Sequence, residues 1–402
     1  MQNIHVMPNH FFTEYFINKI YTIGAGDNNF FIIKEPGRHG VGIDSDAIKT
    51  TCSGNYLFYS CGQLWGCLSK FITSPNAVYF HGLDNESEHC VIKIKKISSV
   101  KVGWIYWGEY ILHSRYKERD FFYSELTRKY VQEQEWGRAN LIKKLMLATG
   151  IFYLRELLNS NVRMFFRTRA IKHVDYFLHW NAYDFLSVME LHGFTENKPA
   201  YKKFSYGEYL EKGSTNFRCS QPDNSTSSND LNVMLGHSAN LSVNHLDGLE
   251  ALRKAFSMLD NKLIINVHCV LSYGDEEYRK KVINDGRLIL GEYFKPITKR
   301  MPLSDYHAFL GMIDAAVFPI RHSAAGGNIA KLLSYGTAIF IDERSTLFSH
   351  FTDMGFDVYP LSAISHDFYN VILRHDKMNN IMRFKEVFTI DAIEQSYKHF
   401  AS

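Results

Sequence analysis

Residues 315–336, AAVFPIRHSAAGGNIAKLLSYG, decide the fold that this sequence predicts. An apolar run ends at Pro319, a polar loop follows, and small residues open a helical pattern. Small residues at a helix start let an anion approach free backbone N–H groups, and the helix dipole adds attraction, so a diphosphate suits this loop. A plain strand–loop–helix connection with glycine in the turn fits the same spacing. The residues that we expect to bind the diphosphate are Arg321, His322, Gly326, Gly327 and Asn328.

Alternating strand and helix patterns surround this stretch in both halves of the chain. In the second half, we expect strands at 231–235, 262–270, 288–290, 315–319 and 338–341, and helices at 244–259, 275–285, 304–312 and 327–335, with Ser304 as an N-cap. In the first half, we expect strands at 3–7, 30–33, 77–80, 103–107 and 174–177, and helices at 10–23, 115–160 and 182–192. This repetition predicts the α/β class, with two doubly wound, Rossmann-like domains built on parallel sheets.

The length of 402 residues also favours two domains, because a single core rarely grows that large. Residues 213–230, GSTNFRCSQPDNSTSSND, are polar and rich in Ser and Asn, which is typical of a linker. We therefore expect an N-terminal domain at 1–212, with a helical part that faces a membrane, and a C-terminal domain at 231–402 that binds the ligand. The last helix of the second domain can pack back on the first.

Composition and charge exclude several classes of protein. A net charge of +3 is too mild for a nucleic-acid partner, which requires a concentrated basic stripe. The six cysteines match no zinc spacing and form no CxxC pair, so we expect free thiols in a reducing compartment and no metal site. The N-terminus lacks a signal peptide and no apolar run could span a bilayer, so we expect a cytoplasmic protein.

A second polar loop follows the strand expected at 231–235, within LNVMLGHSANLSVNH. Ligands of open α/β sheets bind outside the carboxyl ends of the strands, where this loop and the one after 262–270 should lie. A capped helix, with Ser242 or Asn244 as N-cap, is the other interpretation. The residues that we expect to bind the ligand in these two loops are Gly236, His237, Ser238, Asn244, Ser272 and Tyr273.

Two loops in the first half, at 80–85 and 106–110, also follow apolar strands. Glu109, His81 or Asp84 could act there as a general base toward an acceptor hydroxyl. A carboxylate at the end of a strand is, however, often only solvated. We therefore keep all three residues as catalytic candidates and choose none of them.

Residues 115–173 are rich in Lys and Arg, and the stretch 163–169, RMFFRTR, mixes cations with large apolar side chains. Such a surface can lie against an anionic lipid leaflet. A helix with an apolar core face and a solvated basic face has the same periodicity. Binding to anionic liposomes that weakens with salt would favour the membrane interpretation.

Four segments, 78–82 (VYFHG), 104–108 (WIYWG), 303–310 (LSDYHAFL) and 327–336 (GNIAKLLSYG), stand in an order that resembles the TDP-N-acetylfucosamine:lipid II N-acetylfucosaminyltransferases, glycosyltransferase family 56. The resemblance extends from residue 77 onward and is firmest in 231–345. It implies a GT-B glycosyltransferase, in which two Rossmann-like domains face a cleft, acceptor domain first and donor domain second. It also implies no bound metal or other cofactor.

The resemblance further implies the substrates. The donor would be a dTDP-activated 4-acetamido-4,6-dideoxyhexose (Fuc4NAc-like), and the acceptor a polyprenyl-diphosphate-linked saccharide in surface polysaccharide synthesis, such as that of enterobacterial common antigen. The protein would lie peripherally on the cytoplasmic face of the inner membrane. The residues that fall on family positions are Gly236, Ser238, Asn244, Gly327, Trp107 and Gly108.

The sequence departs from this family at two places. After Gly108 the family has a small residue and then an aspartate, where this chain has Glu109 and Tyr110. The loop 321–325 differs as well. Two alternatives therefore stay open: a GT-B transferase that uses another nucleotide sugar, such as a UDP-sugar, for capsule or lipopolysaccharide, or a non-catalytic protein that binds sugar nucleotides.

Overall fold

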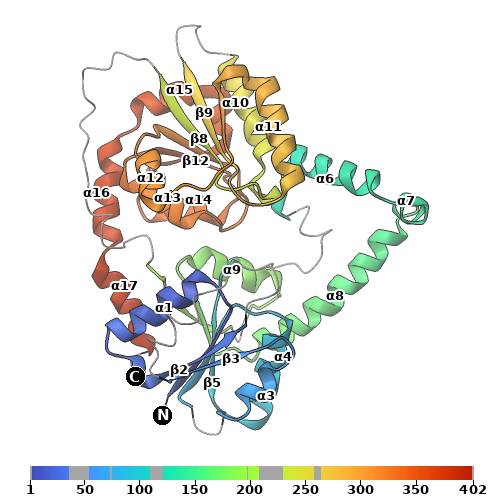
Figure 1. Cartoon of the computed structure of the whole chain (residues 1–402), viewed down its shortest axis with the longest axis vertical. Coiled ribbons are helices and arrows are strands. Elements are labelled where there is room, and N and C mark those ends of the chain that lie inside the picture. The colour runs from blue at the N-terminus through green and yellow to red at the C-terminus, as the bar shows by residue number, and fades with distance from the viewer. Residues whose placement is uncertain are drawn as a thin grey trace. The chain divides into compact units, whose positions relative to one another are not determined.

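The computed structural model describes residues 2–35, 54–72, 75–108, 121–196, 198–207, 230–257 and 264–400 (Figure 1). The chain forms two compact units. The first unit comprises Met1–His113, Leu158–Glu208 and Thr389–Ser402, and the second comprises Ser114–Leu157 and Tyr209–Phe388. Each unit contains one parallel sheet.

The sheet of the first unit has the strand order β3-β2-β1-β4-β5-β6-β7. Its strands are β1 (Asn3–Met7), β2 (Asn29–Lys34), β3 (Tyr56–Tyr59), β4 (Ala77–His81), β5 (Lys101–Ile105), β6 (Tyr176–His179) and β7 (Ala200–Lys203). The helices grouped with it are α1 (Phe11–Thr22), α3 (Leu64–Leu68), α4 (Asn85–Ile97), α9 (Ala182–Leu191) and α17 (Ile390–Tyr397). The central strands β1 and β4 are buried along their whole length, as expected for a sheet covered on both faces.

The sheet of the second unit has the order β10-β9-β8-β11-β12-β13. Its strands are β8 (Leu231–Leu235), β9 (Ile265–Val270), β10 (Phe294–Ile297), β11 (Ala315–Phe318), β12 (Ala338–Ile341) and β13 (Val358–Pro360). Its helices include α10 (His245–Phe256), α11 (Glu276–Leu290), α12 (Leu303–Leu310), α13 (Gly326–Ser334), α14 (Thr346–Asp353), α15 (Ile364–Arg374) and α16 (Lys377–Val387). This order, with the reversal beside β8, is that of a Rossmann-like domain, so the predicted α/β class with two such domains is confirmed.

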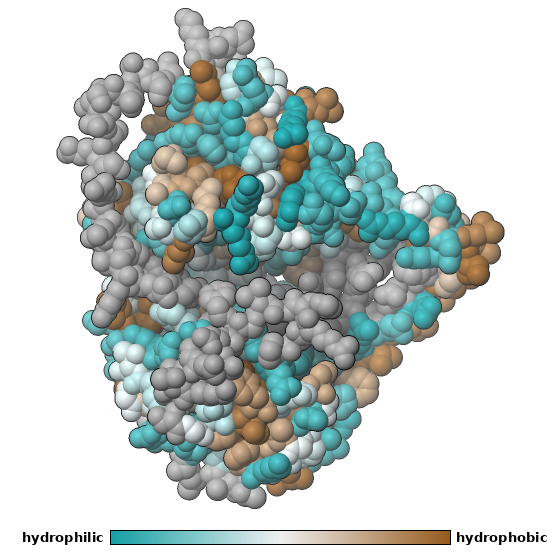
Figure 2. Space-filling view, in the orientation of Figure 1, coloured by the Kyte–Doolittle hydropathy of each residue, from teal (hydrophilic) through white to brown (hydrophobic). Residues whose placement is uncertain are grey.

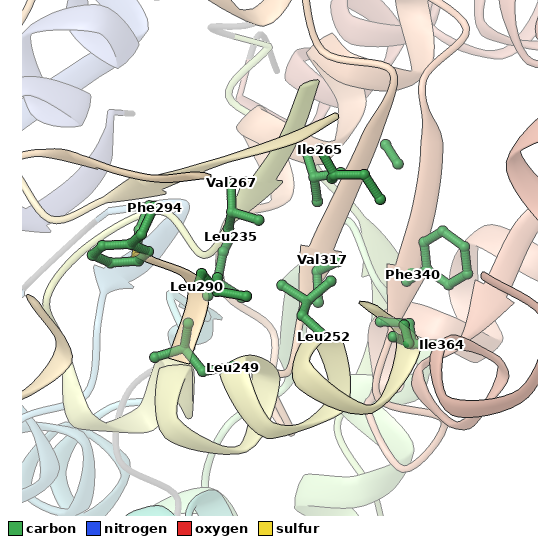
Figure 3. Packing of buried hydrophobic residues seen from close by; sticks show 14 of the residues in the cluster. Leu235, Leu249, Leu252, Ile265, Val267, Leu290, Phe294, Val317, Phe340 and Ile364 are labelled. Atoms are coloured by element: carbon green, nitrogen blue, oxygen red, sulfur yellow. The ribbon is translucent and has the colours of Figure 1, made fainter. Parts of the chain in front are cut away.

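The hydrophobic core of the second unit lies between this sheet and its helices. Figure 3 shows Leu249 and Leu252 of α10 beside Leu235 and Val317 of the sheet, and all four side chains are fully buried. Burying an aliphatic side chain of this size stabilises a fold by ~1.5–3 kcal/mol. The apolar face of α10 therefore fixes this helix directly under the strand ends that precede the expected ligand loops.

Three local predictions were wrong. Residues 288–290 belong to α11 instead of forming a strand, and the strand starts later, at Phe294. Ser304 lies inside α12, whose N-cap position is held by Pro302. The long helix expected at 115–160 is divided, in its described part, into α6 (Glu125–Gly137), α7 (Leu141–Ala148) and α8 (Ile151–Ile171).

Helices α6 and α7 group with the second unit, although their residues precede position 212. The carboxylate of Asp247, on α10, accepts hydrogen bonds from the backbone N–H groups of Leu126 (2.9 Å) and Thr127 (3.1 Å) and from the Thr127 hydroxyl (2.8 Å). A carboxylate suits these free N–H groups in the first turn of α6. Tyr130 of the same helix is part of the second unit's core. The expected linker, 213–230, lies almost entirely outside the described residues.

The last fourteen residues group with the first unit. Tyr397 donates a hydrogen bond to the Tyr206 carbonyl (3.2 Å), and Asn3 donates one to the Phe400 carbonyl (3.3 Å). Both Tyr397 and Phe400 are fully buried. The segment up to Phe400 therefore packs into the core of the unit that contains β1.

Candidate functional site

The strand order of the second unit reverses between β8 and β11, so the loops that follow these two strands run in opposite directions. Such a reversal opens a crevice at the carboxyl edge of a sheet. The Gly236 backbone N–H donates to the Val317 carbonyl (3.0 Å), which fixes the start of the first loop against β11. The expected loops 236–244 and 319–328 therefore lie on the two sides of the same crevice.

Gly236 turns the chain at the end of β8 with a φ of 64°, in the left-handed region that favours glycine. A Cβ atom on this residue would lie 2.4 Å from Nε2 of His245 and 2.8 Å from Val243. The His245 ring is fully buried, and neither of its nitrogens has a hydrogen-bond partner among the described residues. The close packing of Gly236 against His245 is thus the reason for a glycine at this position. The sequence carries no periodic pattern that would have predicted His245 as part of this site.

Asn244 joins three segments of the second unit. This residue is fully buried with a φ of 57°, and its Nδ2 donates to the carbonyls of Pro319 (2.8 Å) and Phe122 (2.9 Å). Its Oδ1 accepts from the Ser124 backbone N–H (2.9 Å). Asn244 occupies the N-cap position of α10, but its side chain makes no cap hydrogen bond there. Its function is therefore to hold the two crevice loops and the 122–124 segment together.

The loop after β11 leads into α13 through Ala325, which has a φ of 60°. Arg321 donates from Nη1 to the Tyr123 carbonyl (3.2 Å), and the His322 ring meets Phe122 edge to face at 4.8 Å. The 122–123 segment comes from the first half of the sequence, so sequence reasoning did not include it in this site. Left-handed backbone just before a helix start aims successive N–H groups outward, an arrangement that suits an anion.

The loop after β9 joins the same region. Residues Ala239 and Gly274 pair in a parallel bridge, and the Ser238 side chain forms a hydrogen bond with Tyr273. The residue Tyr273 is 47% exposed, and the Arg300 guanidinium lies 5.8 Å from the centroid of the Tyr273 ring. An exposed aromatic ring with a nearby cation could receive a flat heterocycle.

Asn328, in the first turn of α13, accepts a hydrogen bond from the Tyr306 hydroxyl (3.2 Å). The structure thus brings His237, Ser238 and Tyr273 to the same sheet edge as Arg321, His322 and the start of α13. Ser272 lies in the loop after β9, next to Tyr273.

Two histidines of this site, His237 and His245, have pKa values lowered by burial. Burial lowers the pKa of His237 to about 4, with a smaller effect from His322, and lowers the pKa of His245 to about 3. Burial also lowers the pKa of Lys331, on the buried side of α13. Arg321 and the N–H groups at the start of α13 are groups of this site that can attract an anion without the protonation of His237 or His245.

The catalytic candidates of the first half lie in the first unit. Asp84 is the N-cap of α4: it accepts from the Ser87 backbone N–H (2.8 Å) and pairs with Lys34 (3.1 Å). Burial raises the pKa of Asp84, but the Ser87 hydrogen bonds and Lys34 outweigh burial and lower it. Glu109 lies outside the described residues.

His81 ends β4 and is buried. Its Nδ1 lies 2.7 Å from the Tyr206 hydroxyl and its Nε2 lies 3.1 Å from Nδ1 of His5. Burial lowers its pKa well below the usual value, and His5 adds to the effect. Both ring nitrogens are thus occupied within the unit, so His81 could reach a substrate proton only through Tyr206.

Comparison with solved structures shows the fold to be that of the GT-B glycosyltransferases, with two Rossmann-like domains. The chain is similar to a glycosyltransferase from Rickettsia africae, with a TM-score of 0.58 at 10% identity over 100% of this chain and 97% of that one. It is also similar to HepE of Anabaena in complex with UDP and glucose (TM-score 0.57, 10% identity, 99% of each chain). A third similar structure, from E. coli, is described as trehalose-6-phosphate bound with UDP-2-fluoro glucose (TM-score 0.56, 9% identity, 100% and 97%).

No model of a protein family matches the sequence, and no curated protein matches it. The fold is therefore established by shape, at identities too low to carry a substrate or a residue role from one chain to another.

Replacing Gly236 by alanine tests the packing of the crevice loop. We expect Gly236→Ala to destabilise the second unit by ~2 kcal/mol or more, because the left-handed backbone costs about 1 kcal/mol and the contact with His245 adds to it. Gly150→Ala is a matched control, since Gly150 belongs to the same unit, has a φ of 74° and has no atom within 4 Å of the added Cβ. Urea unfolding measures both; equal losses would contradict the packing argument.

Acid should weaken the fold through the buried histidines. A histidine that is neutral in the folded state takes up a proton on unfolding below pH 6.5, so stability is present above that pH and is lost as the pH falls toward the folded pKa. From pH 7.0 to 5.5 we expect a loss of about 1 kcal/mol for His245 alone, whose pKa is lowered to about 3. In urea unfolding at both pH values, His245→Leu should reduce the loss by that amount; an unchanged pH dependence would refute the assignment.

Proposed function

We propose that this protein is a glycosyltransferase that takes a sugar from a nucleotide-diphosphate donor. The observation that carries the proposal is the crevice beside β8 and β11, where two polar loops and a glycine-rich helix start meet in a chain with the GT-B fold over its full length. Two of the similar structures were solved with UDP and glucose or with UDP-2-fluoro glucose. The second unit would bind the donor, and the first unit would bind the acceptor.

In the reaction, an acceptor hydroxyl oxygen bonds to the anomeric carbon of the donor sugar while the bond from that carbon to the diphosphate oxygen breaks. The hydroxyl proton passes to a base, for which Glu109, beyond the described residues, remains the candidate. The electron pair leaves with the diphosphate. Hydrogen bonds from the start of α13 and the charge of Arg321 would stabilise this developing charge, so the proposal includes no cofactor and no metal.

For the substrates we propose a dTDP-activated Fuc4NAc-like sugar and a polyprenyl-diphosphate-linked saccharide, on the strength of the resemblance in 78–108 and 303–336. The departure at Glu109 and in 321–325 favours testing a UDP-sugar beside it. Both donors share the diphosphate, so the α13 contacts serve either one. The two donors differ only in the nucleoside and in the sugar that is transferred.

Nucleotide binding tests the donor site. We expect dTDP or UDP to raise the unfolding temperature, by a free energy of about 2.7 kcal/mol at 100 times the dissociation constant. Arg321→Met should weaken the better nucleotide ~10-fold or more, because a charged hydrogen bond is worth ~1.5–3 kcal/mol. Arg253→Met, which removes an exposed arginine paired with Glu250 on α10, is the control and should bind normally.

Transfer is measured with a panel of dTDP- and UDP-sugars, with lipid-linked saccharides as acceptors. Release of nucleoside diphosphate that depends on an acceptor supports the proposal. A chain that binds nucleotide but never turns over any donor would be the non-catalytic binding protein instead.

The exposed apolar side chains of helices α7 and α8 support our proposal that the acceptor lies in a membrane. On α7, Leu141, Ile142 and Leu145 are 85%, 71% and 66% exposed, next to Lys143 and Lys144. Exposed apolar side chains with neighbouring cations are typical of a helix that lies on an anionic lipid surface.

On α8 the exposed apolar residues recur at helical spacing, so they share one face of the helix. They are Ile151, Leu154, Leu158, Val162 and Phe165. Figure 2 shows hydrophobic atoms gathered over α7 and along α8. Among the described helices, none combines the length and the apolar character that a bilayer crossing needs. The exposed apolar faces of α7 and α8 support our proposal of a peripheral contact with the cytoplasmic face of the inner membrane.

Vesicle binding tests this contact. We expect the protein to bind vesicles of phosphatidylcholine with phosphatidylglycerol more tightly than phosphatidylcholine alone, and to lose part of that binding in salt. Replacing Leu141, Ile142 and Leu145 together by serine should weaken partitioning ~10-fold or more, since each buried CH₂ contributes about 0.8 kcal/mol. The matched control replaces Leu288, Leu373 and Met382, exposed by 86%, 62% and 59%, by serine. Equal effects of the two triples would argue against α7 as the contact.

A further inference from the structure

A chain of buried hydrogen bonds crosses the point where the strand order of the first unit reverses, between β1 and β4. Asn29 Oδ1 lies 2.8 Å from His5 Nε2, and His5 Nδ1 lies 3.1 Å from His81 Nε2. His81 Nδ1 lies 2.7 Å from the Tyr206 hydroxyl, which in turn lies 2.7 Å from the indole Nε1 of Trp107. The chain thus runs from a buried amide to a tryptophan beyond the end of β5.

The direction of every bond in this chain follows from its two ends. Asn29 donates from Nδ2 to the carbonyls of Ala25 (2.7 Å) and Phe400 (2.9 Å), so its Oδ1 must accept from His5 Nε2–H. His5 Nδ1 then accepts from His81 Nε2–H, and His81 Nδ1 accepts from the Tyr206 hydroxyl. The Trp107 indole can only donate, and the Tyr206 oxygen accepts from it. All donors and acceptors are matched without any charged ring.

Both histidines are neutral supports in this arrangement. Burial lowers the pKa of His5 to about 3, and burial together with the neighbouring His5 lowers the pKa of His81 well below its usual value. A protonated His5 ring would place its Nδ1–H group against the Nε2–H group of His81 and would lose that hydrogen bond. The chain is therefore built to hold Trp107 in place.

Trp107 is half-buried, and its one polar atom is turned inward to Tyr206. Its ring meets the rings of His10 at 5.2 Å and of Phe12 at 5.6 Å, and Phe12 stacks on Tyr206 at 5.1 Å. His10 and Phe12 are half-buried as well and follow β1, whereas Trp107 follows β5. These three rings therefore form a partly exposed aromatic cluster beyond the carboxyl ends of two strands, where ligands of such sheets bind.

We propose that this aromatic cluster, Trp107 with Phe12 and His10, is a stacking platform for a sugar ring of the acceptor, and that Tyr206, His81 and His5 are its positioning residues. A pyranose presents a face of C–H groups with partial positive charge, which suits the negative face of an aromatic ring, while its hydroxyls stay in water. A flat, rigidly held indole loses little conformational entropy when a sugar binds. The role as acceptor platform rests on the proposed function, but the binding of a sugar here does not require transfer.

The test follows the indole N–H signals of the five tryptophans by NMR while chitobiose and cellobiose are added to the full chain. We expect the Trp107 signal, identified by its loss in Trp107→Phe, to shift with saturation in the millimolar range, and the signal of the exposed Trp136 to stay in place. Trp107→Ala should weaken sugar binding at least 10-fold without changing the thermal shift with nucleotide. No shift of the Trp107 signal with either sugar would overturn the platform.

Tyr206→Phe tests the positioning chain, because it removes only the hydroxyl between His81 and Trp107. We expect the Trp107 indole signal to move upfield as its acceptor is lost, and sugar binding to weaken ~3–10-fold. Tyr201→Phe is the matched control, since it removes another tyrosine hydroxyl bond of the same unit, to the His179 carbonyl (2.7 Å), away from Trp107. A Trp107 signal that is the same in Tyr206→Phe and wild type would refute the chain. If the protein binds nucleotide but no sugar, the platform proposal alone is refuted. If it binds sugar at Trp107 but no nucleotide, the glycosyltransferase proposal is refuted and the sugar site remains.

Discussion

Strand order sets the place of both sites. In the second unit the chain leaves β8 toward β9 on one side, while β11 lies on the other, and the loops that follow must part at the sheet edge. Gly236 makes this possible because only a residue without a Cβ fits over His245. In the first unit the same reversal, between β1 and β4, brings His5 and His81 within hydrogen-bond distance.

The two units use histidine in the same physical way. Burial keeps His5, His81, His237 and His245 neutral, so these rings serve as shape and as hydrogen-bond partners instead of as charges. With these rings neutral, the N–H groups at the start of α13 and the guanidinium of Arg321 would attract the diphosphate. Fixed dipoles of this kind need not reorganise when charge develops, which suits a reaction whose leaving group becomes more negative.

Sequence patterns predicted the sheet better than its surroundings. The strands β8 and β12 were predicted to the residue because their short apolar runs are bounded by turn residues. Residues 288–290 were misassigned because three apolar positions do not distinguish a strand from the last turn of a helix. Ser304 has the chemistry of an N-cap, but α12 already begins at Leu303, with Pro302 in the N-cap position.

The crevice loops of the second unit were visible in the sequence because glycine and polar residues follow buried strands directly. The residues that form hydrogen bonds with these loops could not be predicted from the sequence. Phe122 and Tyr123 reach Asn244 and Arg321 from more than a hundred residues away, and Tyr206 lies in a stretch without any motif. Contacts of this kind depend on tertiary packing, which leaves no periodic trace in one sequence.

The apolar faces of α7 and α8 show what exposure adds to a sequence pattern with two interpretations. The sequence of 115–173 fits a core helix as well as a lipid-facing one, since both have the same spacing of large side chains. Exposure separates them: Leu141 and Ile142 are 85% and 71% exposed, whereas a core stripe would be covered. Leaving several such side chains in water costs a soluble surface about 1.5–3 kcal/mol each relative to burial, and contact with lipid recovers that free energy. In the proposed reaction, the membrane that carries a lipid-linked acceptor would be the surface that covers these exposed apolar side chains.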